Sequence, residues 1–234
     1  MIRDNLKIVR EKIEKKCVES GRNPSEVKLI AVSKNFGIDD IKRAFDEGIR
    51  DFGENRAQEL DKKVELFPEK VNWHFIGNLQ RNKVRFAVRS SEYIHSADSL
   101  LLVSEINKHA GKNNKVQKIL LQVKTSFEET KSGITEYSEL SDLAFYCRDF
   151  PNVDLRGLMT IAPLADNENL LRKSFVTLRK MRDKLKSEGL NISELSMGMS
   201  SDFELAVEEG ATMLRIGSAI FGERDYSTDW KEKL

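Results

Sequence analysis

The sequence contains little cysteine and shows no metal-ligand spacing, and these two absences exclude whole classes of protein. Only two cysteines, Cys17 and Cys147, occur among 234 residues, and they lie far apart. A disulfide framework or a cysteine metal site needs more cysteines or closer spacing, so we expect two reduced thiols. The three histidines, His74, His95 and His109, are not spaced as metal ligands either. No metal site is therefore predicted.

An excess of charge of one sign is also missing. The 39 basic and 38 acidic side chains leave a net charge of +1, which gives no reason to expect nucleic acid or an anionic membrane as a partner. No run of about 18 apolar residues occurs that would span a membrane. The amino terminus alternates charged residues with Ile2, Leu6, Val9 and Ile13, which predicts an amphipathic helix and not a signal peptide. We expect a cytoplasmic protein.

Eight short apolar runs alternate with helical patterns along the chain. Such runs are typical of parallel strands that are covered on both faces. Gly48, Gly189 and Gly210 each follow an acidic helical end and precede a run, where a left-handed helix cap is expected. The predicted strands are Val27–Lys34, Ile49–Asn55, Asn72–Gly77, Glu92–Ala97, Lys118–Lys124, Asp154–Ile161, Glu194–Ser200 and Met213–Gly222.

Strands that alternate with helices indicate an α/β protein with a parallel sheet. Eight such units without a wide linker favour a closed (β/α)8 barrel of the TIM type, with an extra N-terminal helix. A length of 234 residues suits one barrel of this kind, so residues 1–234 are predicted to form a single domain. The alternative is an open, doubly wound sheet. No glycine-rich dinucleotide fingerprint follows the first predicted strand, which disfavours that alternative.

The chemically unusual residues fall near the carboxyl ends of the predicted strands, where barrels of this type carry their sites. Lys34 ends a buried-looking run, and desolvation at a barrel mouth favours the neutral amine that forms Schiff bases. A lysine that extends to solvent is the plainer interpretation. Arg215 lies in an otherwise apolar strand and needs an acceptor. That acceptor is either an ion-pair partner, Glu54 or Asp202, or a ligand atom such as a ring nitrogen.

The seventh predicted strand runs into Ser200, Ser201 and Asp202 before a helix. Hydroxyl groups and backbone N–H groups at a helix start bind anions, although the same residues also serve as helix caps. Gly217 and Ser218 follow in the eighth predicted strand and offer further donors. Because barrels often bind phosphate in the loops after strands seven and eight, we predict an anion site here.

Asn55 and His74 carry weaker signals. Asn55 stands at a strand end, where it would bind a ligand oxygen or cap the following helix. His74 lies between two aromatic residues, a setting more typical of a core histidine than of a reactive one.

Several sequence blocks together carry a resemblance to a known family. They are Ala31-Val32-Ser33-Lys34; Phe52-Gly53-Glu54-Asn55; Trp73-His74-Phe75-Ile76-Gly77 with Leu79-Gln80 and Asn82-Lys83; Lys131-Ser132-Gly133; Gly157-Leu158-Met159; Ser196 to Ser200 with Asp202; and Arg215-Ile216-Gly217 with Ile220-Phe221-Gly222. These blocks resemble the YggS/PROSC family, the pyridoxal phosphate homeostasis proteins, which are related more distantly to the barrel domain of alanine racemases. The resemblance covers nearly the whole chain, in order.

The resemblance implies a fold-type III barrel that binds pyridoxal 5'-phosphate (PLP) as an aldimine on Lys34. By the family pattern, Arg215 faces the pyridine nitrogen, Asn55 lies near the ring, and the phosphate lies among Ser200, Gly217 and Ser218. The complete set of cofactor-binding residues that we predict is Lys34, Asn55, His74, Met197, Ser200, Ser201, Arg215, Gly217 and Ser218. No catalytic residue is predicted.

The chain departs from the family pattern at two places. Arg56 and Ala57 follow Asn55 where the family usually has Tyr-Val, and Lys124 stands where an asparagine is usual. The second departure changes the expected charge at the rim of the pocket, but neither touches the predicted cofactor contacts.

The group that faces the ring nitrogen decides which chemistry the cofactor performs. An arginine does not readily supply the proton that a strong electron sink needs, so aminotransferase and decarboxylase activities are not expected. Racemases tolerate an arginine but need a second base, which that family takes from a C-terminal domain that we expect this chain to lack. We therefore predict no enzyme but a monomeric protein of intracellular PLP homeostasis, which buffers PLP or delivers it to PLP-dependent apoenzymes.

Two other functions stay open. An amino-acid racemase would need a base from within the barrel or from a partner chain, for which Tyr137, Tyr146 and Lys124 are the candidates. Alternatively, Lys34 forms a Schiff base with a carbonyl substrate without any cofactor, as lysine-dependent aldolases do on the same fold.

Overall fold

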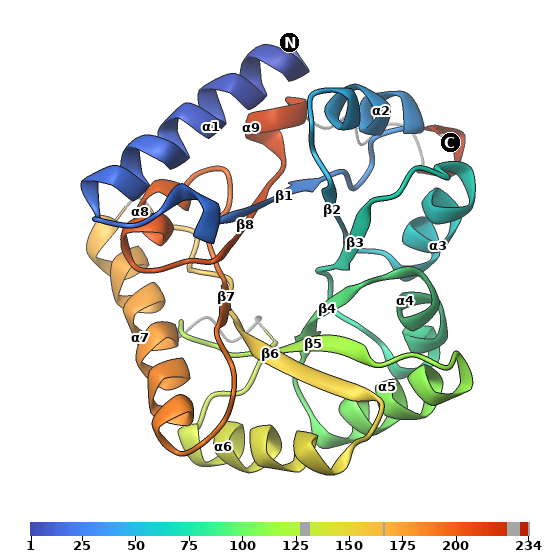
Figure 1. The fold of residues 1–234 in the computed structure, drawn as a ribbon, viewed down its shortest axis with the longest axis vertical. Coiled ribbons are helices and arrows are strands. Elements are labelled where there is room, and N and C mark those ends of the chain that lie inside the picture. The colour runs from blue at the N-terminus through green and yellow to red at the C-terminus, as the bar shows by residue number, and fades with distance from the viewer. Residues whose placement is uncertain (127–131, 166, 224–229, 234) are drawn as a thin grey trace.

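A closed barrel of parallel strands forms the centre of the protein (Figure 1). The computed structural model describes residues 1–126, 132–165, 167–223 and 230–233. Each strand pairs with the next one along the chain, and β8 returns to pair with β1. The strands are β1 (Lys28–Val32), β2 (Asp51–Glu54), β3 (Asn72–Phe75), β4 (Tyr93–Ala97), β5 (Gln117–Gln122), β6 (Val153–Met159), β7 (Glu194–Ser196) and β8 (Met213–Ile216). The predicted closed barrel is thus confirmed, and the open sheet is excluded.

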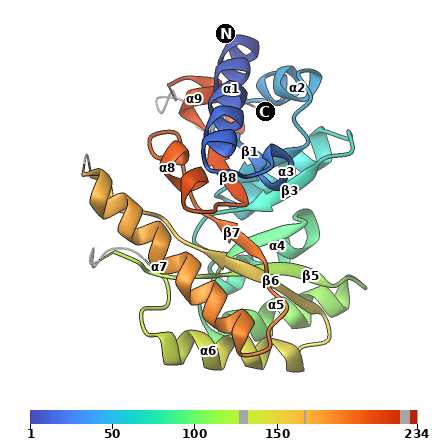
Figure 2. The same ribbon diagram turned by 60° about the vertical axis from the view of Figure 1, so that its left-hand side comes forward.

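Helices connect successive strands and surround the barrel (Figures 1 and 2). The α-helices are α1 (Ile2–Glu19), α2 (Ile38–Asp46), α3 (Ala57–Leu66), α4 (Val84–Ser90), α5 (Leu100–Lys112), α6 (Tyr137–Tyr146), α7 (Glu168–Ser187), α8 (Phe203–Glu208) and α9 (Ser218–Phe221). The short 3-10 helices of the described residues are η1 (Pro24–Glu26), η2 (Arg81–Lys83), η3 (Cys147–Asp149) and η4 (Trp230–Lys233). Among the described residues, no helix is both long enough and apolar enough to cross a membrane.

The predicted N-terminal helix is present as α1, which lies outside the barrel against α8 and α9 (Figure 2). Its apolar face is buried, as the spacing predicts. Asn5 Nδ2 donates to the Ile220 carbonyl at 2.9 Å. Arg22, just after the helix, donates to the carbonyls of Val207 and Ala211 at 2.7 and 2.8 Å. These bonds tie the start of the chain to the helices that flank β8.

Side chains alternate along each strand between the barrel interior and the outer layer. On β8, Leu214 and Ile216 belong to the large apolar core that the helices cover. Met213 instead joins a small buried cluster whose members come from strands around the barrel and therefore meet inside it. That cluster consists of Ile30, Tyr93, Leu120, Met159 and Met213. This alternation decides which strand-end residues can reach a site at the mouth.

Seven predicted strands end earlier than expected, and local backbone geometry explains where three of them end. The predicted strand to Lys34 stops at Val32, and Asn35 has a φ of +64°. The predicted strand to Ser200 was wrong beyond Ser196, because Gly198 turns the chain with a φ of +92°. The predicted strand Met213–Gly222 was wrong beyond Ile216: Gly217 is the N-cap of α9.

The predicted helix caps are confirmed. Gly48, Gly189 and Gly210 have φ values of +87°, +100° and +94°, the left-handed region in which a residue without Cβ avoids strain. Cys17 and Cys147 are both buried and free. Burial raises the pKa of the Cys147 thiol to about 12, so this thiol is protonated at neutral pH.

Truncating the buried face of α1 tests how far this helix contributes to the fold. Leu6 is 1% exposed, whereas Ile8 on the same helix is 52% exposed. We expect Leu6→Ala to lower the free energy of unfolding by about 2–5 kcal/mol, because it removes buried methyl groups and leaves a cavity. Ile8→Ala should change it by less than about 0.5 kcal/mol. Urea unfolding measures both, and equal effects would contradict the packing described here.

Candidate cofactor site

A cavity of about 350 Å³ opens at the carboxyl ends of the strands. Its size lies in the range of small-molecule sites. Lys34 follows β1 and Asn55 follows β2, and both line this cavity, so the structure brings these two predicted residues together. The lining residues are Lys34, Asn55, Ile76, Gly77, Asn78, Gln122, Val123, Lys124, Ser132 and Ile161.

Gly77, just after β3, allows the backbone at Asn55, just after β2, to pass very close to it. A Cβ placed on Gly77 would lie 2.1 Å from the carbonyl oxygen of Asn55. No side chain fits at that separation, so any other residue would push Asn55 away from the cavity wall. Gly77 therefore shapes the site through the backbone.

A buried ammonium group lies beneath the segment that carries Lys34. Lys63 Nζ donates to the Ser33 carbonyl at 2.8 Å, to Glu54 Oε1 at 2.7 Å and to Glu59 Oε1 at 2.8 Å. The side chains of Lys63, Glu54 and Glu59 are 0% exposed. Burial raises the pKa of Glu54 to about 7, although the charge of Lys63 opposes that rise.

The same cluster anchors the backbone on both sides of Lys34. Ser33 Oγ donates to Glu54 Oε1 at 2.7 Å, and the backbone N–H of Asn35 donates to Glu59 Oε1 at 2.9 Å. Each neighbour of Lys34 is thus bonded to a carboxylate that Lys63 also holds. The position of Lys34 at the mouth depends on this buried cluster.

Arg215 lies inside the barrel and is 4% exposed. Its Nη1 donates to Ser196 Oγ at 2.6 Å and its Nη2 donates to the Thr160 carbonyl at 2.8 Å. Burial lowers the pKa of Arg215 to about 10, and the charge of Asp202 opposes this shift. Of the two ion-pair partners that the sequence allowed, Glu54 is bound by Lys63 instead. The hydrogen bonds of the guanidinium end on neutral oxygen atoms.

The predicted anion segments meet at the start of α9. Ser200 Oγ accepts hydrogen bonds from the backbone N–H groups of Gly217 and Ala219, both at 3.2 Å. Ser218 is the first residue of α9. The loop after β7 and the start of α9 are therefore joined, and two N–H donors converge on one oxygen, as they would on an oxygen of an anion.

Three predicted site residues lie elsewhere. Met197 is buried in the core that the helices cover, because Ser196 before it points inward. Ser201 is exposed and lines a neighbouring cavity of about 560 Å³. His74 lies inside the barrel, bonded to other interior side chains, and is not among the residues that line the mouth cavity. Lys131, which is part of the family resemblance, lies outside the described residues.

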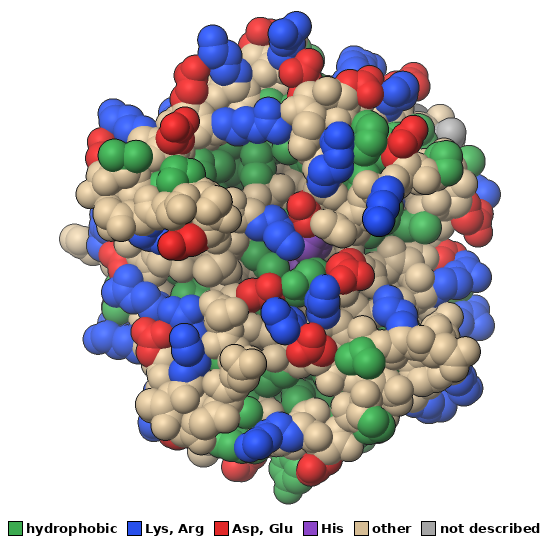
Figure 3. Space-filling view, viewed as in Figure 1, with side chains coloured by type: hydrophobic (Ala, Val, Ile, Leu, Met, Phe, Trp, Pro, Cys, Tyr) green, Lys and Arg blue, Asp and Glu red, His purple; other side chains and the backbone are tan. Residues whose placement is uncertain are grey.

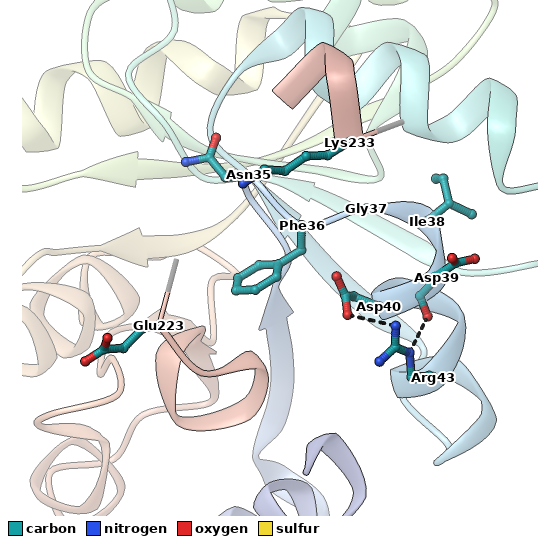
Figure 4. A pocket seen from close by; sticks show the side chains of 9 residues that line it. All are labelled: Asn35, Phe36, Gly37, Ile38, Asp39, Asp40, Arg43, Glu223 and Lys233. Carbon is teal, nitrogen blue, oxygen red and sulfur yellow. Dashed lines mark hydrogen bonds and ion pairs between the residues drawn. The ribbon is translucent and has the colours of Figure 1, made fainter. Parts of the chain in front are cut away.

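A further cavity, of about 470 Å³, adjoins the segment after Lys34 (Figure 4). Arg43 points toward its own helix, where it pairs with Asp40 at 3.4 Å and donates to the Asp39 carbonyl (Figure 4). Neither Lys34 nor Asn55 lines this cavity, so the predicted site residues meet at the barrel mouth instead. Its lining residues are Asn35, Phe36, Gly37, Ile38, Asp39, Asp40, Arg43, Glu223 and Lys233.

Comparison with known proteins places the chain in a family. The sequence profile of the alanine racemase N-terminal domain matches residues 2–225. A pyridoxal phosphate homeostasis protein from Aquifex aeolicus is 44% identical over 225 residues, which cover 95% of this chain and 98% of that protein. The chain belongs to the family of pyridoxal phosphate homeostasis proteins. A homeostasis protein from Escherichia coli K12 is 40% identical over 97% of this chain and 98% of its own length.

Solved structures agree with this family assignment. PipY of Synechococcus elongatus, solved with PLP bound, has a TM-score of 0.84 at 36% identity and covers 95% of this chain and 100% of its own. An alanine racemase from Clostridium difficile has a TM-score of 0.76 at 18% identity, over 99% of this chain and 60% of its own. The second likeness shows the fold alone. The resemblance predicted from the sequence blocks is confirmed.

Sequence reasoning missed Lys63, Glu59 and Ser196. Glu59 and Lys63 are four residues apart on α3, a spacing that surface ion pairs share. Nothing in the sequence separates a buried pair of this kind from an exposed one. Ser196 lay within a matching block, but its bond to Arg215 depends on the pairing of β7 with β8.

Removing Lys63 tests the buried cluster. We expect Lys63→Ala to lower the free energy of unfolding by about 3–5 kcal/mol at pH 7, because two buried carboxyl groups lose their cation. Lys62→Ala, at the exposed neighbouring position, should cost less than about 0.5 kcal/mol. Urea unfolding measures both variants.

The loss of unfolding free energy in Lys63→Ala should also depend on pH. Without Lys63, the buried Glu54 carboxyl group binds its proton more tightly in the folded chain than in the unfolded chain, where its pKa is 4.5. Stability then falls as pH rises above that value. We expect a larger deficit at pH 8 than at pH 5, and a deficit that grows toward low pH would contradict the assignment.

Proposed function

We propose that this protein binds PLP covalently through Lys34 at the barrel mouth and serves in PLP homeostasis, as a reservoir or carrier. One observation supports this most strongly: Lys34 and Asn55 line one cavity at the same end of the barrel as the joined anion segments. The relatives carry the name pyridoxal phosphate homeostasis protein, and PipY, 36% identical, was solved with PLP bound.

The residues present fit the cofactor. Lys34 supplies the amine for the covalent bond, and the cluster around Lys63 holds its backbone in place. Asn55 lines the cavity beside it. The N–H groups of Gly217 and Ala219 converge on Ser200 Oγ in this structure, and we propose them as donors to the phosphate when the cofactor is bound. We assign the phosphate to this junction with Ser200 and Ser218.

Arg215 is proposed to face the ring nitrogen. Bound PLP supplies a ring that withdraws electrons from an attached amine, and protonation of the ring nitrogen strengthens this effect. The pKa of Arg215, about 10, keeps the guanidinium charged at neutral pH, so Arg215 donates a hydrogen bond without giving up its proton. This residue favours storage of the cofactor over carbanion chemistry.

We further propose that the protein does not catalyse racemisation efficiently. Of the three candidate bases, only Lys124 lines the mouth cavity. The Tyr137 hydroxyl donates to Glu188 Oε2 at 2.9 Å, and Tyr146 is exposed on α6. Neither tyrosine is among the cavity-lining residues. Residues 1–234 then act as one PLP-binding unit. Its cytoplasmic location, its monomeric state and PLP-dependent apoenzymes as recipients stay predictions.

The covalent link is tested by absorbance spectra recorded before and after borohydride reduction. Wild-type protein with PLP should show a band near the visible edge that borohydride bleaches. Lys34→Ala should lack this band because the amine is gone. Lys124→Ala, which removes the amine of a second lysine that lines the cavity, should retain it.

Each alternative result has a distinct meaning. A wild type that stays colourless with added PLP would overturn the cofactor assignment. Trapping of a sugar phosphate by borohydride without any cofactor would then favour the aldolase-like alternative. A band lost in Lys124→Ala and kept in Lys34→Ala would move the link to the second lysine.

Solvent deuterium exchange separates the carrier from a catalyst. With the loaded protein in D₂O, we expect common amino acids to gain deuterium at the α-carbon no faster than with free PLP, because no tyrosine among the described residues lines the cavity. Mass spectrometry measures the incorporation. Rapid exchange would establish racemase-like proton transfer and refute the proposal that the protein carries PLP without catalysing this reaction.

A further inference from the structure

A continuous series of side-chain hydrogen bonds crosses the barrel interior. Arg215 Nη1 donates to Ser196 Oγ at 2.6 Å, and Ser196 Oγ lies 2.8 Å from His95 Nδ1. His95 Nε2 lies 2.9 Å from His74 Nδ1, and His74 Nε2 lies 2.9 Å from Asp51 Oδ1. We call these five residues the interior line. It joins Arg215 of β8 to Asp51, the first residue of β2.

The middle of the interior line is shielded from water, and its Asp51 end is 15% exposed. Ser196, His95 and His74 are 0% exposed. In the view down the barrel, histidine lies at the centre among side chains of both charge signs (Figure 3). Buried polar groups of this kind must satisfy one another, so each bond in the line constrains the next.

Donor and acceptor chemistry sets one direction for the whole line. A guanidinium only donates, so Ser196 Oγ accepts from Arg215 and its own proton goes to His95 Nδ1. A neutral His95 then carries its proton on Nε2 and donates it to His74 Nδ1. His74 in turn carries its proton on Nε2 and donates it to Asp51. An ionised carboxylate only accepts, so with two neutral rings the Asp51 end fixes this direction, and the donation from Arg215 to Ser196 is compatible with it.

The surroundings support this protonation pattern. Burial lowers the pKa of His74, and it lowers the pKa of His95 well below its usual value, so both rings are neutral near pH 7. Burial alone would raise the pKa of Asp51, but the bond from His74 and the charge of Lys28 lower it. Lys28 Nζ lies 3.5 Å from Asp51 Oδ1. The Tyr93 ring stacks on His74 with centroids 5.1 Å apart.

We propose that His95 and His74 are positioning residues that hold Arg215 for the cofactor through Ser196. Arg215 is bonded on two sides, by Ser196 of β7 and by the Thr160 carbonyl after β6. His95 accepts the proton of Ser196, and this bond orients the hydroxyl so that a lone pair of Oγ faces Arg215. This inference rests on the proposed function, in which Arg215 faces the ring nitrogen.

The tautomers are tested on the protein without cofactor. ¹⁵N NMR of histidine-labelled protein at neutral pH should show His74 and His95 as neutral rings protonated on Nε2. His109, the third histidine, is assigned by its own substitution. A ring protonated on Nδ1, or a charged ring, at position 74 or 95 would refute the direction of the line. This result does not depend on PLP.

The effect on Arg215 is tested by PLP titration of three variants. His95→Leu breaks the line, and we expect about tenfold weaker PLP binding by absorbance, because the guanidinium loses its fixed partner. His95→Gln offers an acceptor and a donor and should recover part of the affinity. Tyr93→Phe alters a neighbouring ring whose hydroxyl bonds Glu194 instead, and should bind PLP as the wild type does.

Failure of the positioning role and failure of the proposed function give different results. Unchanged affinity in His95→Leu, or an equal loss in Tyr93→Phe, would refute a positioning role. A wild type that binds no PLP would overturn the proposed function, while the NMR result still decides the direction of the line. If His95→Leu does not fold, NMR of the wild type together with the His95→Gln titration decides the proposal.

Discussion

Charges that are shut away from water need partners, and this requirement organises the interior of the barrel. Lys63 and Arg215 are both buried. Lys63 is surrounded by two carboxylates and a carbonyl. Arg215 bonds neutral oxygens, and a series of intermediate side chains joins it to the carboxylate of Asp51. Removing one partner would leave a charge uncompensated where the dielectric is low.

These two sets of buried bonds position the two ends of the proposed site. The Lys63 cluster anchors the neighbours of Lys34, the residue proposed to carry the cofactor. The interior line restrains Arg215, the residue proposed to face the ring. The polar interior thus differs from the usual packing of branched apolar side chains inside such barrels, and only a small apolar cluster fills the remainder.

The residue at position 124, on the rim of the barrel mouth, differs from the one that family membership led us to expect. Lys124 lines the cavity together with Lys34, and the family resemblance led us to expect an asparagine at position 124. A second lysine in the cavity wall changes the charge that an entering anion meets. The two predicted anion segments meet at the start of α9. The distant likeness to alanine racemases extends to the fold, and neither candidate tyrosine lines the cavity.

Much of the fold was predictable because apolar runs and glycine caps are local signals. The eight strands, the N-terminal helix and the closed barrel follow from them. The residues at which strands end were less predictable. The chain turns at Gly198 after β7, and Gly217 begins α9 directly after β8. Because apolar residues continue past these points, the sequence pattern does not mark the strand ends.

The residues of the candidate site were also predictable only in part. The sequence by itself determined that Lys34, Asn55, Ser200 and Arg215 stand near strand ends, because their types break an apolar pattern. Only the tertiary structure decided that Met197 belongs to the outer core, that Lys63 lies beneath Lys34, and that His95 and His74 connect Arg215 to Asp51. The physical reason is that these contacts join strands and helices far apart in the chain. Barrel closure and strand register bring them together, and no local pattern encodes either one.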